Sequence, residues 1–333
     1  MNDIDFVILW VDGNDPNWLK EKNKYDINIK GKDYINSNNR YRDWDNLQYW
    51  FRSVEKYTPW VRKIHFITWG HLPKWLNINH PKLNIIKHED YIPKEYLPTF
   101  NSNVIELNLH RIDDLSENFV LFNDDNFMNK AVAPEFFFKN DLPCDSAILN
   151  ALIMEELFSY TVANDLFIIN KHFDKEKSIN QNKSKWFNLK YGKAVLKNIF
   201  FNTYKSFSGF YDPHVATSHK KSVFKEVWNK EYELLDNACK NKFRSNNDIS
   251  QWLFRYWNLA SGNFYPRNKS CSRLYPIHDD CNINNLTKDI LNQQHTLICI
   301  NDDIKDEKTF DTVSKQLIET FKNVFPEKSS FEI

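Results

Sequence analysis

The stretch Phe6-Val7-Ile8-Leu9-Trp10-Val11, which runs into Asp12-Gly13-Asn14-Asp15, decides the fold of this chain. Its residues are apolar without alternation, as in a strand buried on both faces of a parallel sheet. Similar short apolar runs occupy residues 64–68, 83–86, 119–122 and 297–300. We therefore predict a strand at each of these five places.

An amphipathic helix is predicted between the first two strands and ends before Pro59. Its apolar residues recur at helical spacing: Leu47, Trp50, Phe51, Val54 and Tyr57. A strand–helix–strand order indicates a parallel sheet with crossover helices. The predicted fold class is α/β, with a mostly parallel central sheet and flanking helices.

The rest of the chain indicates how this core is divided. Residues 1–146 are predicted as its first part and residues 208–333 as its second part. Residues 147–207 mix helical stretches with Lys, Asn and Ser, and are predicted to be a helical insertion or lid. A second helix is expected from Ser102, its capping residue, to about residue 112. A last helix is expected at residues 307–324, packed on the core rather than on a membrane.

Charge argues against a nucleic-acid partner. The chain has 333 residues with 44 basic and 44 acidic side chains, so its formal net charge is zero. A neutral protein has no overall field that would attract polyanions. The basic stretch at residues 183–197 remains a local exception.

Only six glycines are present, and none are spaced as in a dinucleotide fingerprint or a Walker A loop. Any bound phosphate must therefore be held by side chains, a metal or helix N-termini. The five cysteines include no C-x-x-C pair, which favours reduced thiols over a zinc ribbon or disulfide framework. The first apolar run is too short for a membrane span and lies between Asp5 and Asp12, so we expect a cytoplasmic protein without a signal peptide.

Acidic clusters follow three of the predicted strands. Asp12 and Asp15 follow the first, Asn123-Asp124-Asp125 the fourth, and Asn301-Asp302-Asp303 the last. Ligands bind beyond the carboxyl ends of parallel strands, where these clusters would meet. Clustered carboxylates suit Mg²⁺ or Mn²⁺, although Asp and Asn are also ordinary turn residues.

Three further features leave two interpretations open. The predicted second helix carries Glu106 and His110 on one polar face, which could be a solvated surface or a pocket wall. His214 could be catalytic or structural. Arg244 could bind phosphate or belong to a capping motif.

Five stretches resemble the sequence blocks of the Stealth family. Residues 4–16 resemble the first block. Residues 40–76 and 97–125 are similar to the second, beginning with Arg40-Tyr41-Arg42-Asp43. Residues 213–248, which begin with Pro213-His214, resemble the third. Residues 299–303 resemble the fourth. The blocks occur in order over most of the chain.

The resemblance implies a Rossmann-like fold of the nucleotide-sugar transferase type and a known reaction. A hexose 1-phosphate, expected to be that of an N-acetylhexosamine, would pass from a nucleotide sugar to a sugar hydroxyl of a cell-surface polysaccharide. A phosphodiester forms and a nucleoside monophosphate is released. The acceptor would be a polysaccharide or a lipid-linked oligosaccharide, with at most peripheral membrane contact at the inner face.

The resemblance also implies roles for individual residues. The catalytic residues would be His214 as general base, Asp125 and Arg244. The metal ligands for Mg²⁺ or Mn²⁺ would be Asp124, Asp125 and Asp302. The substrate-binding residues would be Trp10, Asp12, Gly13, Arg42, Asp43, Asn101, Glu106, His110, Arg111 and Asp248.

Two rival functions remain open at this stage. A metal-dependent glycosyltransferase would use similar acidic residues but would release a nucleoside diphosphate. A carbohydrate-binding protein would use the abundant Trp and Tyr side chains and would turn nothing over. The nucleotide that is released distinguishes all three.

Overall fold

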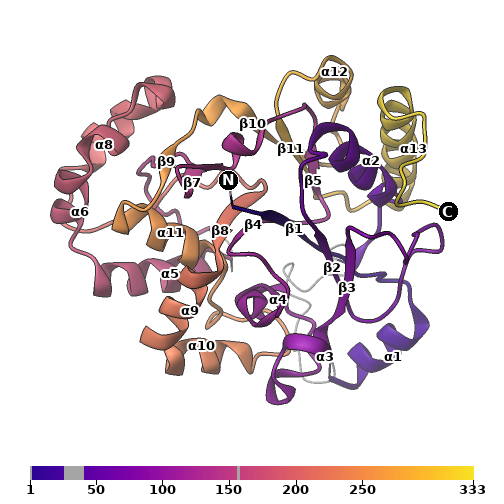
Figure 1. Ribbon diagram of the computed structural model, residues 1–333, viewed down its shortest axis with the longest axis horizontal. Coiled ribbons are helices and arrows are strands. Elements are labelled where there is room, and N and C mark those ends of the chain that lie inside the picture. The colour runs from indigo at the N-terminus through magenta and orange to yellow at the C-terminus, as the bar shows by residue number, and fades with distance from the viewer. Residues whose placement is uncertain (1, 26–40, 156–157) are drawn as a thin grey trace.

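The central sheet of the protein has five strands in the order β3-β2-β1-β4-β8. The structure is a computed structural model that describes residues 2–25, 41–155 and 158–333 (Figure 1). The strands are β1 (Ile4–Leu9), β2 (Ile64–Thr68), β3 (Leu83–Lys87), β4 (Asn118–Phe122) and β8 (Thr217–Lys220). The first four are mutually parallel, and β8 pairs antiparallel with β4 at one edge.

The register explains why the predicted strands are apolar throughout. Phe6 of β1 lies opposite Ile64 of β2 and Val120 of β4. Every residue of β2 and β4 is buried, as expected for strands covered on both faces. The predicted α/β fold with a mostly parallel sheet and flanking helices is confirmed.

The strand predicted at residues 297–300 does not belong to the central sheet, where we expected it beside the other predicted strands. It lies in a second sheet. β11 (Leu297–Asp302) pairs in parallel with β10 (Ser272–Ile277) and antiparallel with β5 (Asn126–Met128). This second sheet still meets the first, because the Ile300 amide donates to the Asp125 carbonyl at 2.9 Å. A third small sheet contains β6 (Phe138–Lys139), β7 (Leu142–Asp145) and β9 (Tyr265–Pro266).

Helices flank the central sheet on both sides (Figure 1). Two hydrophobic cores pack these helices against the two faces of the sheet. One contains Phe6 and Val120 and joins the sheet to α2 (Leu47–Tyr57), α12 (Asn284–Asn292) and α13 (Glu307–Val324). The other contains Val7 and Phe119. Its helices are α3 (His88–Tyr91), α4 (Ser102–Leu107), α5 (Phe158–His172), α6 (Lys175–Gln181), α7 (Lys183–Trp186), α9 (Lys221–Lys230), α10 (Tyr232–Cys239) and α11 (Trp252–Ser261).

The helix predictions are confirmed for α2 and α13 and need correction for α4. α2 ends at Tyr57, before Pro59, and α13 buries its apolar stripe against the protein, with Leu317 only 1% exposed. α4 ends at Leu107 rather than near residue 112. Its N-cap is Asn101, whose side chain accepts from the Asn103 amide, and not Ser102.

The segment between the two parts of the core is largely helical. It contains α5, α6, α7 and α8 (Val195–Phe201). Its division from the core at residues 147 and 207 stays a prediction. One further helix, α1 (Pro16–Tyr25), follows β1. Within the described residues, no helix combines the length and apolar character needed to cross a membrane.

Candidate active site

A cavity of about 550 Å³ opens where β1, β4 and β11 end. Residues from all three places line it, including Trp10, Asp124 and Asp302. It therefore occupies the carboxyl end of the parallel strands, where ligands bind in open α/β sheets. The predicted site residues that line it are Trp10, Arg42, Asp43, Glu106, Asp124, Asp125, His214, Arg244 and Asp302.

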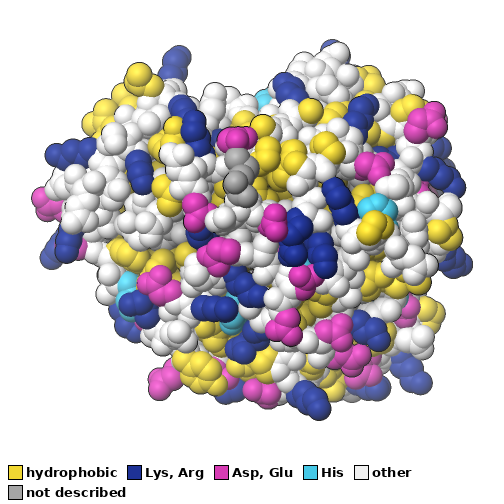
Figure 2. Space-filling view, in the orientation of Figure 1, with side chains coloured by type: hydrophobic (Ala, Val, Ile, Leu, Met, Phe, Trp, Pro, Cys, Tyr) yellow, Lys and Arg dark blue, Asp and Glu magenta, His cyan; other side chains and the backbone are white. Residues whose placement is uncertain are grey.

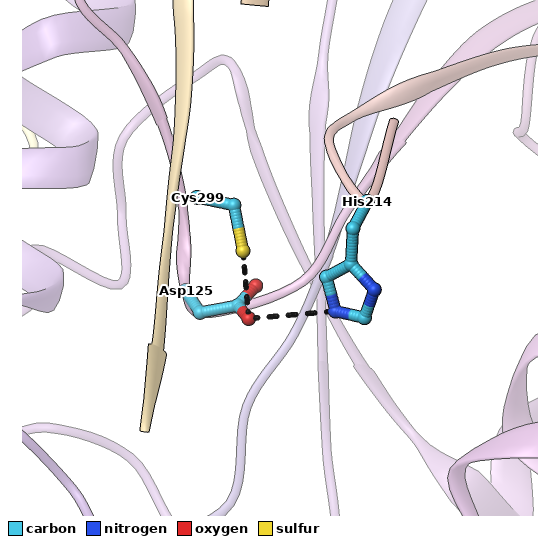
Figure 3. Close-up of side chains that lie close together, drawn as sticks. All are labelled: Asp125, His214 and Cys299. Carbon is cyan, nitrogen blue, oxygen red and sulfur yellow. Dashed lines mark hydrogen bonds and ion pairs between the residues drawn. The ribbon is translucent and has the colours of Figure 1, made fainter. Parts of the chain in front are cut away.

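Asp125 and His214 line this cavity and form a compact cluster with Cys299, which is buried behind them (Figure 3). The His214 Nε2 atom lies 3.9 Å from Asp125 Oδ2, and the Cys299 thiol donates to the same oxygen at 3.2 Å. One potential ligand atom from each residue lies within 4.8 Å of the others. Burial, followed by the charge of Asp125, raises the pKa of the Cys299 thiol well above its ordinary value. The uncharged thiol can therefore donate a hydrogen bond to the carboxylate.

A second buried network supports the loop that carries His214. His214 has a left-handed φ of 49°, which a residue other than glycine adopts only when its surroundings enforce it. Asp212, two residues earlier, accepts from Arg255 Nη1 and from the Tyr256 hydroxyl, each at 2.6 Å. Arg255 also donates to both oxygens of Asp145. The residues of this network position His214 but do not themselves line the cavity.

Asp124 is exposed in the cavity and lies among like charges. Desolvation inside the cavity raises its pKa above the ordinary value, and the charges of Asp125 and Asp43 act in the same direction. Asp43 itself is held by Trp10 Nε1, which donates to its Oδ2 at 3.2 Å. Among the described residues, no Lys or Arg forms an ion pair with Asp124 or Asp125. This oxygen donor set fits a divalent cation, which would compensate its charge.

Asp302 has a cationic partner within the protein. Arg42 donates from Nη2 to both of its oxygens, at 2.9 and 2.8 Å, and from Nε to Oδ2 at 3.1 Å. The distances from Arg42 Nη2 to the two oxygens are typical of charge-assisted hydrogen bonds. The pair joins the segment after residue 40 to the end of β11. Arg40, which begins the proposed second sequence block, lies outside the described residues.

Arg244 and Glu106 meet at another wall of the cavity. Arg244 Nη2 donates to Ser102 Oγ at 2.8 Å. Burial raises the pKa of Glu106 to about 7, although the charge of Arg244 and a hydrogen bond from Ser102 oppose the shift. Glu106 and Asn103 are thus buried rather than part of a solvated stripe.

Several predicted substrate-binding residues lie behind the walls rather than on them. Among the described residues, the cavity lining leaves out Asp12, Gly13, Asn101, His110, Arg111 and Asp248. Asp248 accepts from Asn101 at 2.8 Å and from Asn103 at 3.1 Å, and so ties the Arg244 loop to α4. Their observed contacts are structural, and a direct role in substrate binding stays a prediction.

His110 and Arg111 pack on Trp228 instead. The His110 ring centroid lies 5.6 Å from that of Trp228, and the Arg111 guanidinium lies 4.9 Å from the same ring. Burial and the charge of Arg111 lower the pKa of His110 to about 3. A residue outside the cavity cannot take a proton from a substrate inside it.

Gly13 lets the backbone of Tyr41 approach closely, because glycine has no Cβ atom. A Cβ atom there would lie 1.9 Å from the carbonyl oxygen of Tyr41, which lines the cavity. The backbone amide of Asp12 donates a hydrogen bond to His71 Nε2 at 2.8 Å. Asp12 and Gly13 therefore affect the cavity through the position of their backbone, and not through side chains that line it.

The sequence reasoning missed Cys299, which it treated as an ordinary buried thiol. All five cysteines are free, as predicted. The available signal was the position of Cys299 two residues before Asn301-Asp302 on a strand. Only the pairing of that strand beside Asp125 shows its relevance.

Comparison with known proteins identifies the family. Stealth protein conserved region 1 matches residues 2–30, conserved region 2 matches residues 40–145, and conserved region 4 matches residues 288–333. The chain is 50% identical to the capsular polysaccharide phosphotransferase WcwK of Streptococcus pneumoniae, with 100% of this chain and 99% of that protein covered. It belongs to the Stealth family.

Other relatives of this chain are also named polysaccharide phosphotransferases. The exopolysaccharide phosphotransferase cps2G of Lactiplantibacillus plantarum is 40% identical, with 99% of this chain and 96% of that protein covered. The receptor polysaccharide phosphotransferase WefC of Streptococcus gordonii is 38% identical, with 99% of each covered. The Stealth protein described here is therefore a transferase enzyme. The assignment of residues 213–248 to the third Stealth block stays a prediction.

Solved structures show a more distant likeness. The galactosyltransferase LgtC, in complex with donor and acceptor sugar analogs, matches with a TM-score of 0.41 and 10% identity over 98% of both chains. The bifunctional glycosyltransferase WbbM matches with a TM-score of 0.40 and 9% identity. That match covers 97% of this chain and 50% of the other.

Proposed function

We propose that this Stealth-family enzyme transfers a hexose 1-phosphate, that of an N-acetylhexosamine, from a nucleotide sugar to a hydroxyl of a cell-surface polysaccharide. The observation that carries the proposal is the full-length 50% identity to a protein named a capsular polysaccharide phosphotransferase. The cavity supports it, because a histidine, an arginine and clustered carboxylates converge there.

His214 is proposed as the general base. Imidazole titrates near neutral pH and can accept the proton of an acceptor hydroxyl. Asp125, at 3.9 Å, would stabilise the imidazolium that results. The hydroxyl oxygen then forms a bond to the sugar-bearing phosphorus. The P–O bond to the second phosphate breaks, and the nucleoside monophosphate leaves with that electron pair.

Asp124 and Asp125 are proposed to hold a divalent cation, Mg²⁺ or Mn²⁺, with Asp302 as a third ligand. Such an ion would neutralise negative charge that develops on the leaving nucleoside monophosphate. The two oxygens of Asp302 already accept three contacts from Arg42 and one from the Ile304 amide, so binding the ion would displace one of these hydrogen bonds. Arg244, held by Ser102, would contact the transferred phosphoryl oxygens.

The wall residues are proposed to seat the donor. Trp10 presents an aromatic ring at the end of β1, and Asp43 accepts from its indole nitrogen. Arg42 and Glu106 line the cavity from different segments of the chain and would contact polar groups of the donor. The acceptor is proposed to be a polysaccharide or a lipid-linked oligosaccharide, with the enzyme working in the cytoplasm at the inner face of the membrane.

The released nucleotide tests this proposal. The purified enzyme is incubated with Mg²⁺, an oligosaccharide acceptor and a panel of UDP- and GDP-sugars, and products are separated by anion-exchange chromatography. Release of UMP or GMP, with a ³¹P resonance of a phosphodiester in the product, is expected. Release of UDP or GDP would establish a glycosyltransferase instead. Absence of turnover with every donor would favour a carbohydrate-binding protein.

A further inference from the structure

Helix α8 presents apolar side chains to solvent. Leu196, Ile199 and Phe200 lie three and four residues apart, which places them on one face of the helix. Their exposed fractions are 64%, 55% and 60%. Asn198, a polar residue of the same helix, is only 1% exposed. Two other apolar residues of α8, Val195 and Phe201, pack against the core, so this helix presents apolar side chains both inward and outward.

Hydrogen bonds of the buried Asn198 side chain hold α8 in this orientation. The Asn198 side-chain nitrogen donates to the carbonyl oxygens of Ala147 and Trp186, at 2.7 and 2.5 Å. Its side-chain oxygen accepts from the Leu149 amide at 2.6 Å. Turning the helix over would leave these buried polar groups without partners, which is costly. The outward apolar face is therefore a property of the folded protein.

The exposed apolar surface continues on both sides of α8. Leu189, just before it, is 92% exposed, and Tyr204, just after it, is 50% exposed. We define the α8 face as Leu189, Leu196, Ile199, Phe200 and Tyr204. A second segment, residues 150–154, is joined to the chain that follows α8, because the Leu152 amide donates to the Ser208 carbonyl at 2.9 Å. That segment adds Ile153 and Met154, which are 64% and 52% exposed.

Positive charge predominates around α8, although Glu155, next to Met154, is also exposed. Residues 177–211 contain seven lysines and neither Asp nor Glu, in a chain whose total charge is zero. Lys183, Lys193 and Lys205 are exposed. Basic and hydrophobic side chains occur together at the edge of the molecule where α8 lies (Figures 1 and 2). By contrast, exposed acids accompany the lysines of α13, which buries its own apolar stripe.

We propose that the α8 face docks this enzyme on an anionic lipid surface. Exposed Leu, Ile and Phe side chains can enter the headgroup and acyl boundary, while lysines above them pair with anionic headgroups. A soluble polyanion would engage the lysines but leave the apolar side chains in water. The inference rests on the surface alone and does not depend on the reaction that the cavity catalyses.

Vesicle co-sedimentation of the full chain tests this proposal. The probes are phosphatidylcholine vesicles with and without 30% phosphatidylglycerol. The test variants are Ile199→Ser/Phe200→Ser, which removes apolar contact, and Lys193→Gln/Lys205→Gln, which removes charge. The matched controls are Ile78→Ser/Leu291→Ser, at exposed apolar positions elsewhere, and Lys308→Gln/Lys315→Gln on α13. Thermal melts check that every variant is folded.

The wild-type protein is expected to sediment with the anionic vesicles and to be released by high salt. Each test variant should partition at least tenfold less, and the controls should match the wild type. Failure of the wild type to bind anionic vesicles overturns the proposal, as does unchanged binding by the Ile199→Ser/Phe200→Ser variant. A wild-type dimer that this variant converts to a monomer, in analytical ultracentrifugation, would assign the face to a second copy of the chain and also overturn it.

Discussion

The guanidinium of Arg42 donates hydrogen bonds to both carboxylate oxygens of Asp302, which lies 260 residues further along the chain. Arg42 also donates to the Ile304 carbonyl at 2.9 Å and stacks 3.8 Å from the Phe310 ring centroid. One side chain thereby joins the segment after residue 40 to the end of β11 and the start of α13. The shape of the cavity wall depends on this connection.

Breaking that pair should lower activity. Asp302→Asn removes the charge but keeps the shape, and a hydrogen bond to a charged group contributes about 2 kcal/mol. We expect kcat/KM to fall by roughly 30-fold. The matched control is Glu307→Gln, because Glu307 also pairs with Arg42 but its side chain is 76% exposed. An equal loss in both variants would contradict a specific role for Asp302.

Replacing His214 by Gln should slow the chemical step. A positioned general base contributes roughly 10²–10⁴-fold to the rate, so kcat should fall by that factor while donor binding changes little. His278→Gln is the control, because His278 lies at the same 3.9 Å from an aspartate, Asp303, but is 61% exposed. Steady-state kinetics and donor titration calorimetry check both variants. A folded His214→Gln enzyme with the wild-type rate would place the base elsewhere.

Chelation should abolish turnover, and Mg²⁺ or Mn²⁺ should restore it. The reason is the adjacent carboxylates Asp124 and Asp125 in the cavity, whose like charges need compensation. Asp125→Asn should raise the metal concentration for half-maximal activity by roughly tenfold or more. Cys299→Ala should change it little, because thiols are soft ligands that Mg²⁺ disfavours. Full activity in excess chelator would contradict the metal assignment, and a loss confined to Cys299→Ala would indicate a softer ion.

Gly13→Ala should distort the cavity wall. Its Cβ would overlap the Tyr41 carbonyl oxygen, so the backbone segment that carries Arg42 and Asp43 must move. We expect a stability loss of about 1–3 kcal/mol and a raised KM for the donor. Asn14→Ala, at the exposed neighbouring position, is the control. Urea unfolding and kinetics measure both, and a wild-type KM in Gly13→Ala would refute this role.

Stability should fall as the pH is lowered from about 6.5 to 4, in part through His219. Burial lowers the pKa of His219 to about 4, and its Nε2 lies 2.9 Å from Gln251 Oε1. The nearby charged groups that act on it are Asp145 and Arg255. The unfolded state binds the extra proton first, so the contribution is complete above pH 6.5 and is lost toward pH 4.

The loss attributable to His219 is roughly 3 kcal/mol over that window. Urea unfolding at several pH values should show a shallower pH dependence for His219→Gln than for the wild type. His278→Gln, at an exposed position, should keep the wild-type dependence. Parallel curves for His219→Gln and the wild type would show that other groups carry the effect.

Much of the fold was predictable from local patterns. Continuous apolar runs predicted β2 and β4, and the 3.6-residue period predicted α2 and α13, because these patterns record which faces are buried. The acidic pair Asp124 and Asp125 was predictable for the same reason, since it directly follows a buried strand. α4 was predicted too long, because side-chain periodicity does not show where a helix stops.

Only the tertiary structure decided which distant elements meet. Strand pairing placed β11 in a separate sheet and brought Cys299 to Asp125, 174 residues away, and the Asn198 hydrogen bonds turned the apolar face of α8 outward. Local periodicity predicts that a residue is buried or paired, but not with which partner. That choice depends on packing and hydrogen bonding across the whole chain, because a contact between distant residues leaves no mark in the spacing of either one.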